Sequence, residues 1–148
     1  MFKVELKYIN TDSLFYKEAV AIRKELFFKN MENSTSLIQD NFEENGIHVV
    51  CLNDNKVVGT GRMNVVNDTS IVSQMAIKST CQNQGVGSKI LKALIEKSKE
   101  KGLSKIKLSA RKTAISFYEK FNFKPCGNQY PSKKTGIIHQ EMELKIKQ

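Results

Sequence analysis

The sequence predicts an α/β fold in which helices cover a mixed, mostly antiparallel sheet. Three strand-like apolar runs separated by short polar turns occupy residues 47–77, which is the pattern of an antiparallel meander. An amphipathic helix begins near Gly85, with apolar residues at helical spacing. The 148 residues have 40% hydrophobic content, which suits one compact domain over residues 1–148.

The N-terminal part is expected to hold a strand and two helices. Residues 2–9 alternate apolar and charged side chains like a strand, and Asp12 is the expected N-cap of the first helix. The apolar face of this helix contains Leu14, Phe15, Ala19, Ile22, Leu26 and Phe27. The polar stretch that follows is expected to form a short helix over 36–42 and to loop at Gly46.

The rest of the chain alternates strands and helices. Three strands are expected at 47–52, 56–66 and 69–77, with hairpin turns at 53–55 and 67–68. The next helix ends at Gly102 and has its apolar face at Val86, Ile90, Leu91, Leu94 and Ile95. The remaining elements are a strand at 105–109, a helix at 113–121 and closing strands near 123–127 and 137–146.

The net charge of +9 raises the question of a nucleic-acid partner. The excess is almost wholly lysine, because arginine occurs only at 23, 62 and 111. Recognition of bases and phosphates depends strongly on arginine, and no DNA-binding motif is present. The charge therefore indicates a solvated face, and no nucleic-acid partner is expected.

Composition also indicates whether the protein is secreted, spans a membrane or binds a metal. The start of the chain lacks the apolar run of a signal peptide, and no segment approaches the roughly 18 apolar residues of a membrane span. Cys51, Cys81 and Cys126 are odd in number and lack C-x-x-C spacing, so neither a disulfide framework nor a metal site is expected. A cytoplasmic protein without membrane contact is the simplest expectation.

The segment 82–87, Gln-Asn-Gln-Gly-Val-Gly, joins the third strand of the meander to the amphipathic helix. The first N–H groups of a helix lack intrahelical acceptors and lie at the positive end of its dipole, so this junction suits an anion. A P-loop would need four residues between its first glycine and Gly-Lys-Ser/Thr, and a dinucleotide fingerprint would need glycine in place of Ile90. The residues exclude both of these motifs.

The same segment resembles the Q/R-x-x-G-x-G/A loop of the GNAT superfamily of N-acetyltransferases. A second motif agrees, because residues 114–123, Ala-Ile-Ser-Phe-Tyr-Glu-Lys-Phe-Asn-Phe, resemble the family's A-x-x-F-Y-x-K-x-G-F helix. The resemblance covers most of residues 47–146, and the last strand resembles the small bacterial ElaA-like branch. Three positions depart from the family pattern, namely Ser79 for proline, Asn83 for glycine and Asn122 for glycine. Asparagine tolerates the left-handed conformation, so the last two are mild changes.

The resemblance implies the GNAT fold, with six to seven strands and about four helices, and acetyl-coenzyme A as cosubstrate. In the family the loop holds the pyrophosphate, and free backbone groups of the preceding strand hold the acetyl oxygen and the pantetheine arm. Carried over to this chain, the cofactor-binding residues are Met75, Ala76, Ile77, Gln82, Asn83, Gln84, Gly85, Val86, Gly87 and Ser88. Tyr118 matches the tyrosine that protonates the departing sulfur, although its apolar neighbours equally suit a packing role.

The general base and the acceptor remain open. The base candidates are His48, His139, Glu43 and Glu44, and each histidine equally suits a hydrogen-bonded structural role. Arg62 is either a ligand for an acidic substrate group or an ordinary surface arginine. The positive charge favours an anionic amine over a polycationic one as acceptor.

Direct N-acetyl transfer to a primary amine of a small molecule or a protein is the expected function. A module of the same fold that binds acetyl-coenzyme A without catalysis, as a sensor or interaction partner, is the alternative. A nucleic-acid binder is a third possibility, which salt-dependent DNA affinity would reveal. The chain is expected to be a monomer or a homodimer.

Overall fold

The computed structural model describes residues 3–28 and 37–146. Its strands form one sheet in the order β1-β2-β3-β4-β5-β8-β6, with β7 also paired to β8. The strands are β1 (Glu5–Ile9), β2 (Ile47–Asn53), β3 (Lys56–Val66), β4 (Thr69–Ile77), β5 (Lys105–Arg111), β6 (Lys124–Pro125), β7 (Tyr130–Pro131) and β8 (Ile138–Lys145). The helices are α1 (Tyr16–Phe27), α3 (Val86–Glu100) and α4 (Ile115–Glu119), with short 3₁₀ turns η1 (Ser79–Cys81) and η2 (Lys112–Ala114).

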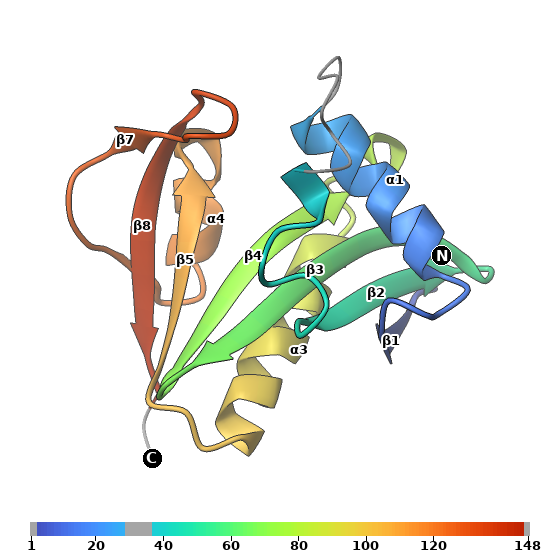
Figure 1. The fold of residues 1–148 in the computed structure, drawn as a ribbon, viewed down its shortest axis with the longest axis horizontal. Helices are drawn as coiled ribbons and strands as arrows, with labels where there is room; N and C mark the ends of the chain where they lie inside the picture. The colour runs from blue at the N-terminus through green and yellow to red at the C-terminus, as the bar shows by residue number, and fades with distance from the viewer. Residues whose placement is uncertain (1–2, 29–36, 147–148) are drawn as a thin grey trace.

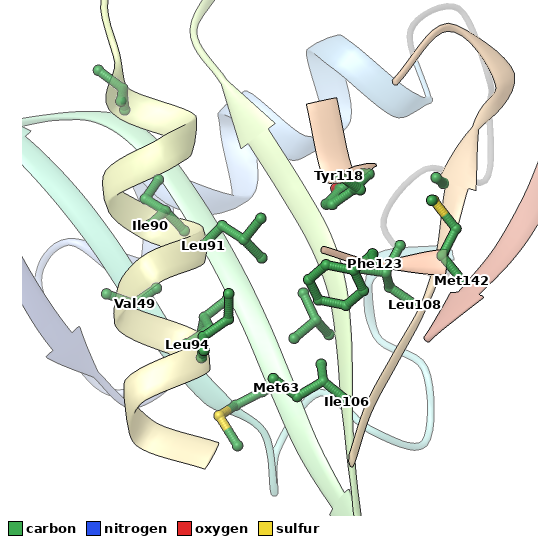
Figure 2. Packing of buried hydrophobic residues seen from close by; sticks show 14 of the residues in the cluster. Val49, Met63, Ile90, Leu91, Leu94, Ile106, Leu108, Tyr118, Phe123 and Met142 are labelled. Atoms are coloured by element: carbon green, nitrogen blue, oxygen red, sulfur yellow. The ribbon is translucent and has the colours of Figure 1, made fainter. Parts of the chain in front are cut away.

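The first half of the sheet is covered on both faces, by α1 on one side and by α3 on the other (Figure 1). Alternate residues of β2 therefore enter different cores: Val49 and Cys51 pack with α3, whereas Val50 and Leu52 pack with α1. This explains why β2 and β3 are buried almost without interruption rather than at every second residue. Figure 2 shows the larger core, in which Ile90, Leu91 and Leu94 of α3 face the sheet.

The sheet divides between β4 and β5, its one parallel pair. These strands pair only from Thr69 to Ile71 on β4 and from Lys105 to Lys107 on β5. Beyond these residues they diverge, and Figure 1 shows the resulting V-shaped opening. The family resemblance implies this separation, which leaves one side of the distal half of β4 without a strand neighbour.

A bulge distorts β4 at the level of this opening. Arg62 of β3 is paired with Ser73, whereas Thr60 is paired with Ala76, so two residues of β4, Gln74 and Met75, lie opposite the single residue Gly61. Gln74, one of the two, has a φ of 55°, which is unusual for a residue other than glycine. The bulge redirects the backbone of β4 where the strand borders the opening.

Most predicted elements are present, and the three meander strands match within one residue. Two expectations for the first helix are wrong. Asp12 is not its N-cap, because the helix begins at Tyr16 after Phe15, and the Asp12 N–H instead donates to Asn10 Oδ1 in the preceding turn. Leu14 is 94% exposed because it lies before the helix, outside its apolar face.

The C-terminal part is more finely divided than expected. The helix expected at 113–121 begins as η2 and continues as the short α4, and β7 was not foreseen because it has only two residues. The described residues form eight strands against the six to seven expected, and α1, α3 and α4 against about four expected helices. The helix expected at 36–42 lies partly outside the described residues: Leu37 and Ile38 are helical, whereas 39–46 form turns and bends. None of the described helices is both long and apolar enough to span a bilayer.

Candidate active site

A cavity of about 540 Å³ occupies the opening between β4 and β5. Its wall on the β4 side includes Ser73, Gln74 and Met75 of the bulge, and its opposite wall includes Arg111 of β5. Tyr118 of α4 and His139 of β8 also line it, as do Phe27, Phe28, Asp40, Arg62, Lys107, Ser109, Tyr130, Lys133, Lys134 and Glu141. The cavity thus collects side chains from segments that are far apart in the sequence.

The predicted anion loop lies at the end of β4. Gly85 is the N-cap residue of α3 with a φ of 81°, a conformation that glycine adopts without steric cost. Asn83 has a φ of 64°, so asparagine does adopt the left-handed conformation here. Within the described part of the chain, no backbone carbonyl accepts the N–H groups of Val86, Gly87 or Ser88. The loop therefore presents donors at the positive end of a 15-residue helix.

Two glycines of β3 allow α3 to approach the sheet closely. A Cβ atom on Gly59 would lie 2.8 Å from Val86 Cγ1, and one on Gly61 would lie 2.8 Å from Ile90 Cγ2. These distances are shorter than real side chains allow. Because glycine has no Cβ, the first turns of α3 can lie directly against β3 at both positions.

The backbone of β4 alternates between its neighbour and the opening. The Lys78 N–H donates to the Val58 carbonyl at 2.8 Å, so Lys78 faces β3 and the adjacent Ile77 faces away from it. The amide of Gln82 donates to the Ile77 carbonyl at 3.2 Å, on that outward side. Gln82 thus ties the anion loop to the end of β4.

Tyr118 lies between the core and the cavity. Its ring packs edge-on against Phe117 and Phe123, and the residue is 9% exposed. Figure 2 shows Tyr118 beside Phe123 at the margin of the core. No hydrogen bond to the Tyr118 hydroxyl is found among the described residues, whereas every fully buried side-chain polar atom there has a partner, so this hydroxyl is not fully buried. The residue lines the cavity. Burial raises the pKa of Tyr118 to about 12, so the phenol is protonated at neutral pH.

His139 is held in one tautomer. Its Nδ1 lies 2.8 Å from the Ile137 carbonyl, which can only accept a hydrogen bond, so Nδ1 carries the proton. The neutral ring then has an unprotonated Nε2. His139 is paired across the sheet with Arg111 and also with Tyr130, and all three residues line the cavity.

His48 has a different environment. It is 2% exposed, its Nε2 lies 2.9 Å from the Glu43 carbonyl, and its ring packs edge-on against Tyr16. Burial lowers its pKa. His48 does not line the cavity. This geometry suits a hydrogen-bonded structural histidine rather than a general base.

A charge cluster supports the β4 side of the cavity, and we define it as the buried Arg23, Glu43 and Arg62 together with the partly exposed Asp40. Glu43 receives hydrogen bonds from both guanidinium groups, at 2.7 and 2.8 Å from Arg23 and at 2.8 Å from Arg62. Tyr16 also donates to it. Burial alone would raise the pKa of Glu43, but the hydrogen bonds from Arg23, Tyr16 and Arg62 lower it to about 2. Glu44, the neighbouring base candidate, is exposed and does not line the cavity.

The charge cluster also holds the bulge of β4. Arg23 Nε donates to Gln74 Oε1 at 3.1 Å, and Arg62 Nε donates to Ser73 Oγ at 3.0 Å. The surface interpretation of Arg62 is wrong, because its side chain is 4% exposed and is also bound to Asp40 at 3.0 Å. Its guanidinium group is thus used within the protein, on two carboxylates and a hydroxyl.

Comparisons with known proteins agree with this geometry. The family described as acetyltransferase (GNAT) domain matches residues 12–146. The chain belongs to the GNAT acetyltransferase family. It is an acyltransferase, as its resemblance to the family predicts.

Individual relatives of this acetyltransferase match over nearly the whole chain. It is 30% identical to the uncharacterized protein YyaT of Bacillus subtilis, over 97% of each chain. The crystal structure of Escherichia coli ElaA is similar in fold, with a TM-score of 0.78 and 15% identity over 95% of this chain and 99% of that one. An aminoglycoside 6'-N-acetyltransferase complexed with coenzyme A has a TM-score of 0.79 and 12% identity, over 97% and 98% of the two chains.

Sequence reasoning did not find the charge cluster of this acetyltransferase as a unit. One signal was present: Arg23 falls at helical spacing with Ala19 and Leu26, on the apolar face of α1, where a lone arginine requires a buried partner. The cavity role of Arg111 gave no such signal, because it depends on the pairing of β5 with β8. The described residues contain no group of three His, Cys, Asp or Glu side chains arranged to hold a metal ion.

Proposed function

We propose that this acetyltransferase moves the acetyl group of acetyl-coenzyme A directly to a primary amine of its acceptor. The observation that carries the proposal is the position of Tyr118, which lines the cavity where β4 leaves β5. The similarity in fold to an aminoglycoside acetyltransferase complexed with coenzyme A supports the choice of cosubstrate.

Backbone groups hold the coenzyme in this proposal. The N–H groups around Gly85 and Gly87 bind its pyrophosphate at the start of α3, with Gln82, Asn83, Gln84, Val86 and Ser88 completing the loop. The outward-facing backbone of Met75 and Ile77, with Ala76 between them, binds the pantetheine arm and the acetyl oxygen. An oxyanion donor of this kind contributes about 2.7–4 kcal/mol to transition-state stabilisation.

Tyr118 is the proposed general acid. The amine nitrogen attacks the thioester carbon, the new C–N bond forms, and the C–S bond then breaks to release a thiolate. Tyr118 donates its proton to that sulfur. With a pKa of about 12 the phenol retains its proton at neutral pH and is available for this step.

His139 is the proposed general base. A primary amine such as that of lysine has a reference pKa of about 10.4 and must lose a proton before or during attack. His139 lines the cavity, and because its Nδ1 donates to the Ile137 carbonyl, Nε2 is the ring nitrogen left to accept a proton, whereas His48 and Glu43 are buried in contacts with each other and with the arginines. The low pKa of Glu43 also makes it a weak base.

Two measurements test the proposal. Calorimetry should detect binding of coenzyme A, and a thiol-release assay over a panel of primary amines should detect turnover with acetyl-coenzyme A. If coenzyme A binds but none of the amines is acetylated, the result would favour the alternative of a non-catalytic sensor. Absence of binding would refute the proposal as a whole.

A further inference from the structure

The charges that line the cavity are unequal in number. Of the described residues, five cations line it, Arg62, Lys107, Arg111, Lys133 and Lys134, against two carboxylates, Asp40 and Glu141. A cavity of this composition, partly shielded from water, concentrates positive potential. It therefore repels a second positive charge on an acceptor and attracts a negative one.

Both carboxylates are already matched by cations of the cavity wall. Asp40 is bound to Arg62 at 3.0 Å and to Lys134 at 3.4 Å, and Glu141 lies 3.8 Å from Lys107. Burial alone would raise the pKa of Asp40, but its hydrogen bond with Arg62 lowers that pKa, which keeps the carboxylate ionised. Neither carboxylate is left to receive the ammonium group of a polycationic acceptor.

Arg111 has no carboxylate partner among the described residues. Its Nη2 donates to the neutral Leu26 carbonyl at 3.2 Å, and its guanidinium group lies over the Phe27 ring, 5.0 Å from the centroid. These two contacts with the end of α1 fix the side chain across the cavity while most of its five donors are left for another acceptor. A planar, fixed guanidinium group is well suited to bidentate binding of a carboxylate or phosphate.

The proposed base is next to this guanidinium group. Arg111 and His139 are directly opposite each other on β5 and β8, so their side chains project from the same face about 5 Å apart at Cβ. An acceptor that placed its amine at His139 would therefore present a nearby substituent to Arg111.

We infer that the acceptor is a compact primary amine carrying a carboxylate or phosphate group, and that Arg111 binds this anionic group. The inference rests on the proposed function, since it assigns the substrate class of the same site. It makes Arg111 a specificity-determining residue and predicts weak use of polycationic amines.

The first experiment compares matched amines with the wild-type enzyme. Phosphoethanolamine is compared with ethanolamine, and β-alanine with β-alaninamide, so that each pair differs in the anionic group and the two pairs distinguish phosphate from carboxylate. At least one anionic amine should have a kcat/KM roughly tenfold or more above its neutral partner. Equal or better use of both neutral partners would overturn the inference, even if acetyl transfer itself were observed.

The second experiment removes the guanidinium group. In Arg111→Gln the KM for the preferred anionic amine should rise roughly ten- to a hundredfold, with little change for its neutral partner. Lys92→Gln is the matched control, because Lys92 is an exposed cation of α3 outside the cavity. Acetyl-coenzyme A affinity should be unchanged in both variants. A selective loss of that affinity in Arg111→Gln would mean that Arg111 binds the cosubstrate, which would refute the assignment.

If no amine is acetylated, the proposed function fails while the inference is still tested by binding. Backbone amide shifts on titration with phosphoethanolamine and β-alanine should then map to the cavity in the wild type and weaken in Arg111→Gln. If neither compound causes such shifts, the inference that Arg111 binds the anionic group of the acceptor is refuted.

Discussion

The anion loop at the end of β4 and the charge cluster beside its bulge lie along the same strand but are built differently. The anion loop presents backbone N–H groups, and its shape depends on left-handed residues such as Asn83 and Gly85. The charge cluster consists of side chains from α1, β3 and the segment between α1 and β2, joined by hydrogen bonds of 2.7 to 3.2 Å. The loop depends on local conformation, and the cluster depends on long-range partners.

This difference determines how each region responds to substitution. A backbone site is damaged by a residue that cannot adopt its dihedral angles and is insensitive to most other changes. A buried cluster of charges is damaged when any one member loses its partner, because the remaining charges stay desolvated. The predictions below test this contrast, beginning with the largest expected effect.

Glu43→Gln should have the largest effect on stability. Glu43 is the carboxylate shared by Arg23 and Arg62, so the substitution leaves two buried guanidinium groups without it. Loss of one partner of a buried ion pair costs about 3–5 kcal/mol, measurable by urea unfolding. Glu44→Gln is the matched control, because Glu44 is exposed, and it should change stability by less than about 0.5 kcal/mol. Equal stabilities for the two variants would contradict the role of the cluster.

The same carboxylate should make stability depend on pH. The pKa of Glu43 is lowered from 4.5 to about 2 in the folded protein. A lowered pKa contributes stability that is fully present above pH 4.5 and is lost as the pH falls from 4.5 toward 2. Unfolding free energies measured across this range should fall more steeply for the wild type than for Glu43→Gln. Parallel curves would mean that Glu43 is not held ionised by the cluster.

Tyr118→Phe tests the cavity that this tyrosine lines. Removing the proposed acid should lower kcat about a hundredfold, or about 2.7 kcal/mol, while coenzyme A binding changes little. Tyr8→Phe provides the matched control, since the Tyr8 hydroxyl is bound to the Ala93 carbonyl outside the cavity. An unchanged kcat in Tyr118→Phe would leave the tyrosine with a packing role only.

Two glycines of the anion loop should respond unequally to alanine. Gly85→Ala places a side chain at a φ of 81° and should cost about 1–2 kcal/mol of stability and weaken coenzyme A binding. Gly87→Ala should be nearly neutral for stability, because its Cβ would lie 3.5 Å from Phe117 Cζ, an ordinary contact. Unfolding curves and coenzyme A titrations of both variants check this. Similar losses of stability and coenzyme A binding in the two variants would show that the loop is sensitive to side-chain volume rather than to backbone conformation.

The contrast also explains what the sequence could predict. The loop, the meander and α3 were predicted because glycine, asparagine and apolar periodicity act within a few residues of the structure they specify. The left-handed conformations of Asn83 and Asn122 were anticipated for the same reason. The roles assigned to Tyr118 and the loop residues came from the family resemblance and remain proposals.

The features that were missed involve residues distant in the chain. For Arg62 the sequence left a substrate ligand and a surface arginine as alternatives, because nothing within its strand indicates that Asp40 and Glu43 lie over it. The left-handed Gln74 gave no signal, since glutamine has no preference for that conformation, and its side chain is bound to Arg23, 51 residues away. The first helix begins later than expected because Ser13 Oγ accepts the Phe15 N–H in the turn that precedes it.

The short parallel ladder between β4 and β5 has a mechanical consequence. Among the described residues, the ladder between β4 and β5 joins residues 69–71 to residues 105–107 and no further residues of the two strands. Each half has its own antiparallel hydrogen bonds, so a change in the angle between them need not break either set. The angle between the halves is therefore set by the hydrophobic core that they share, which includes Met63 of β3 together with Ile106 of β5 and Met142 of β8.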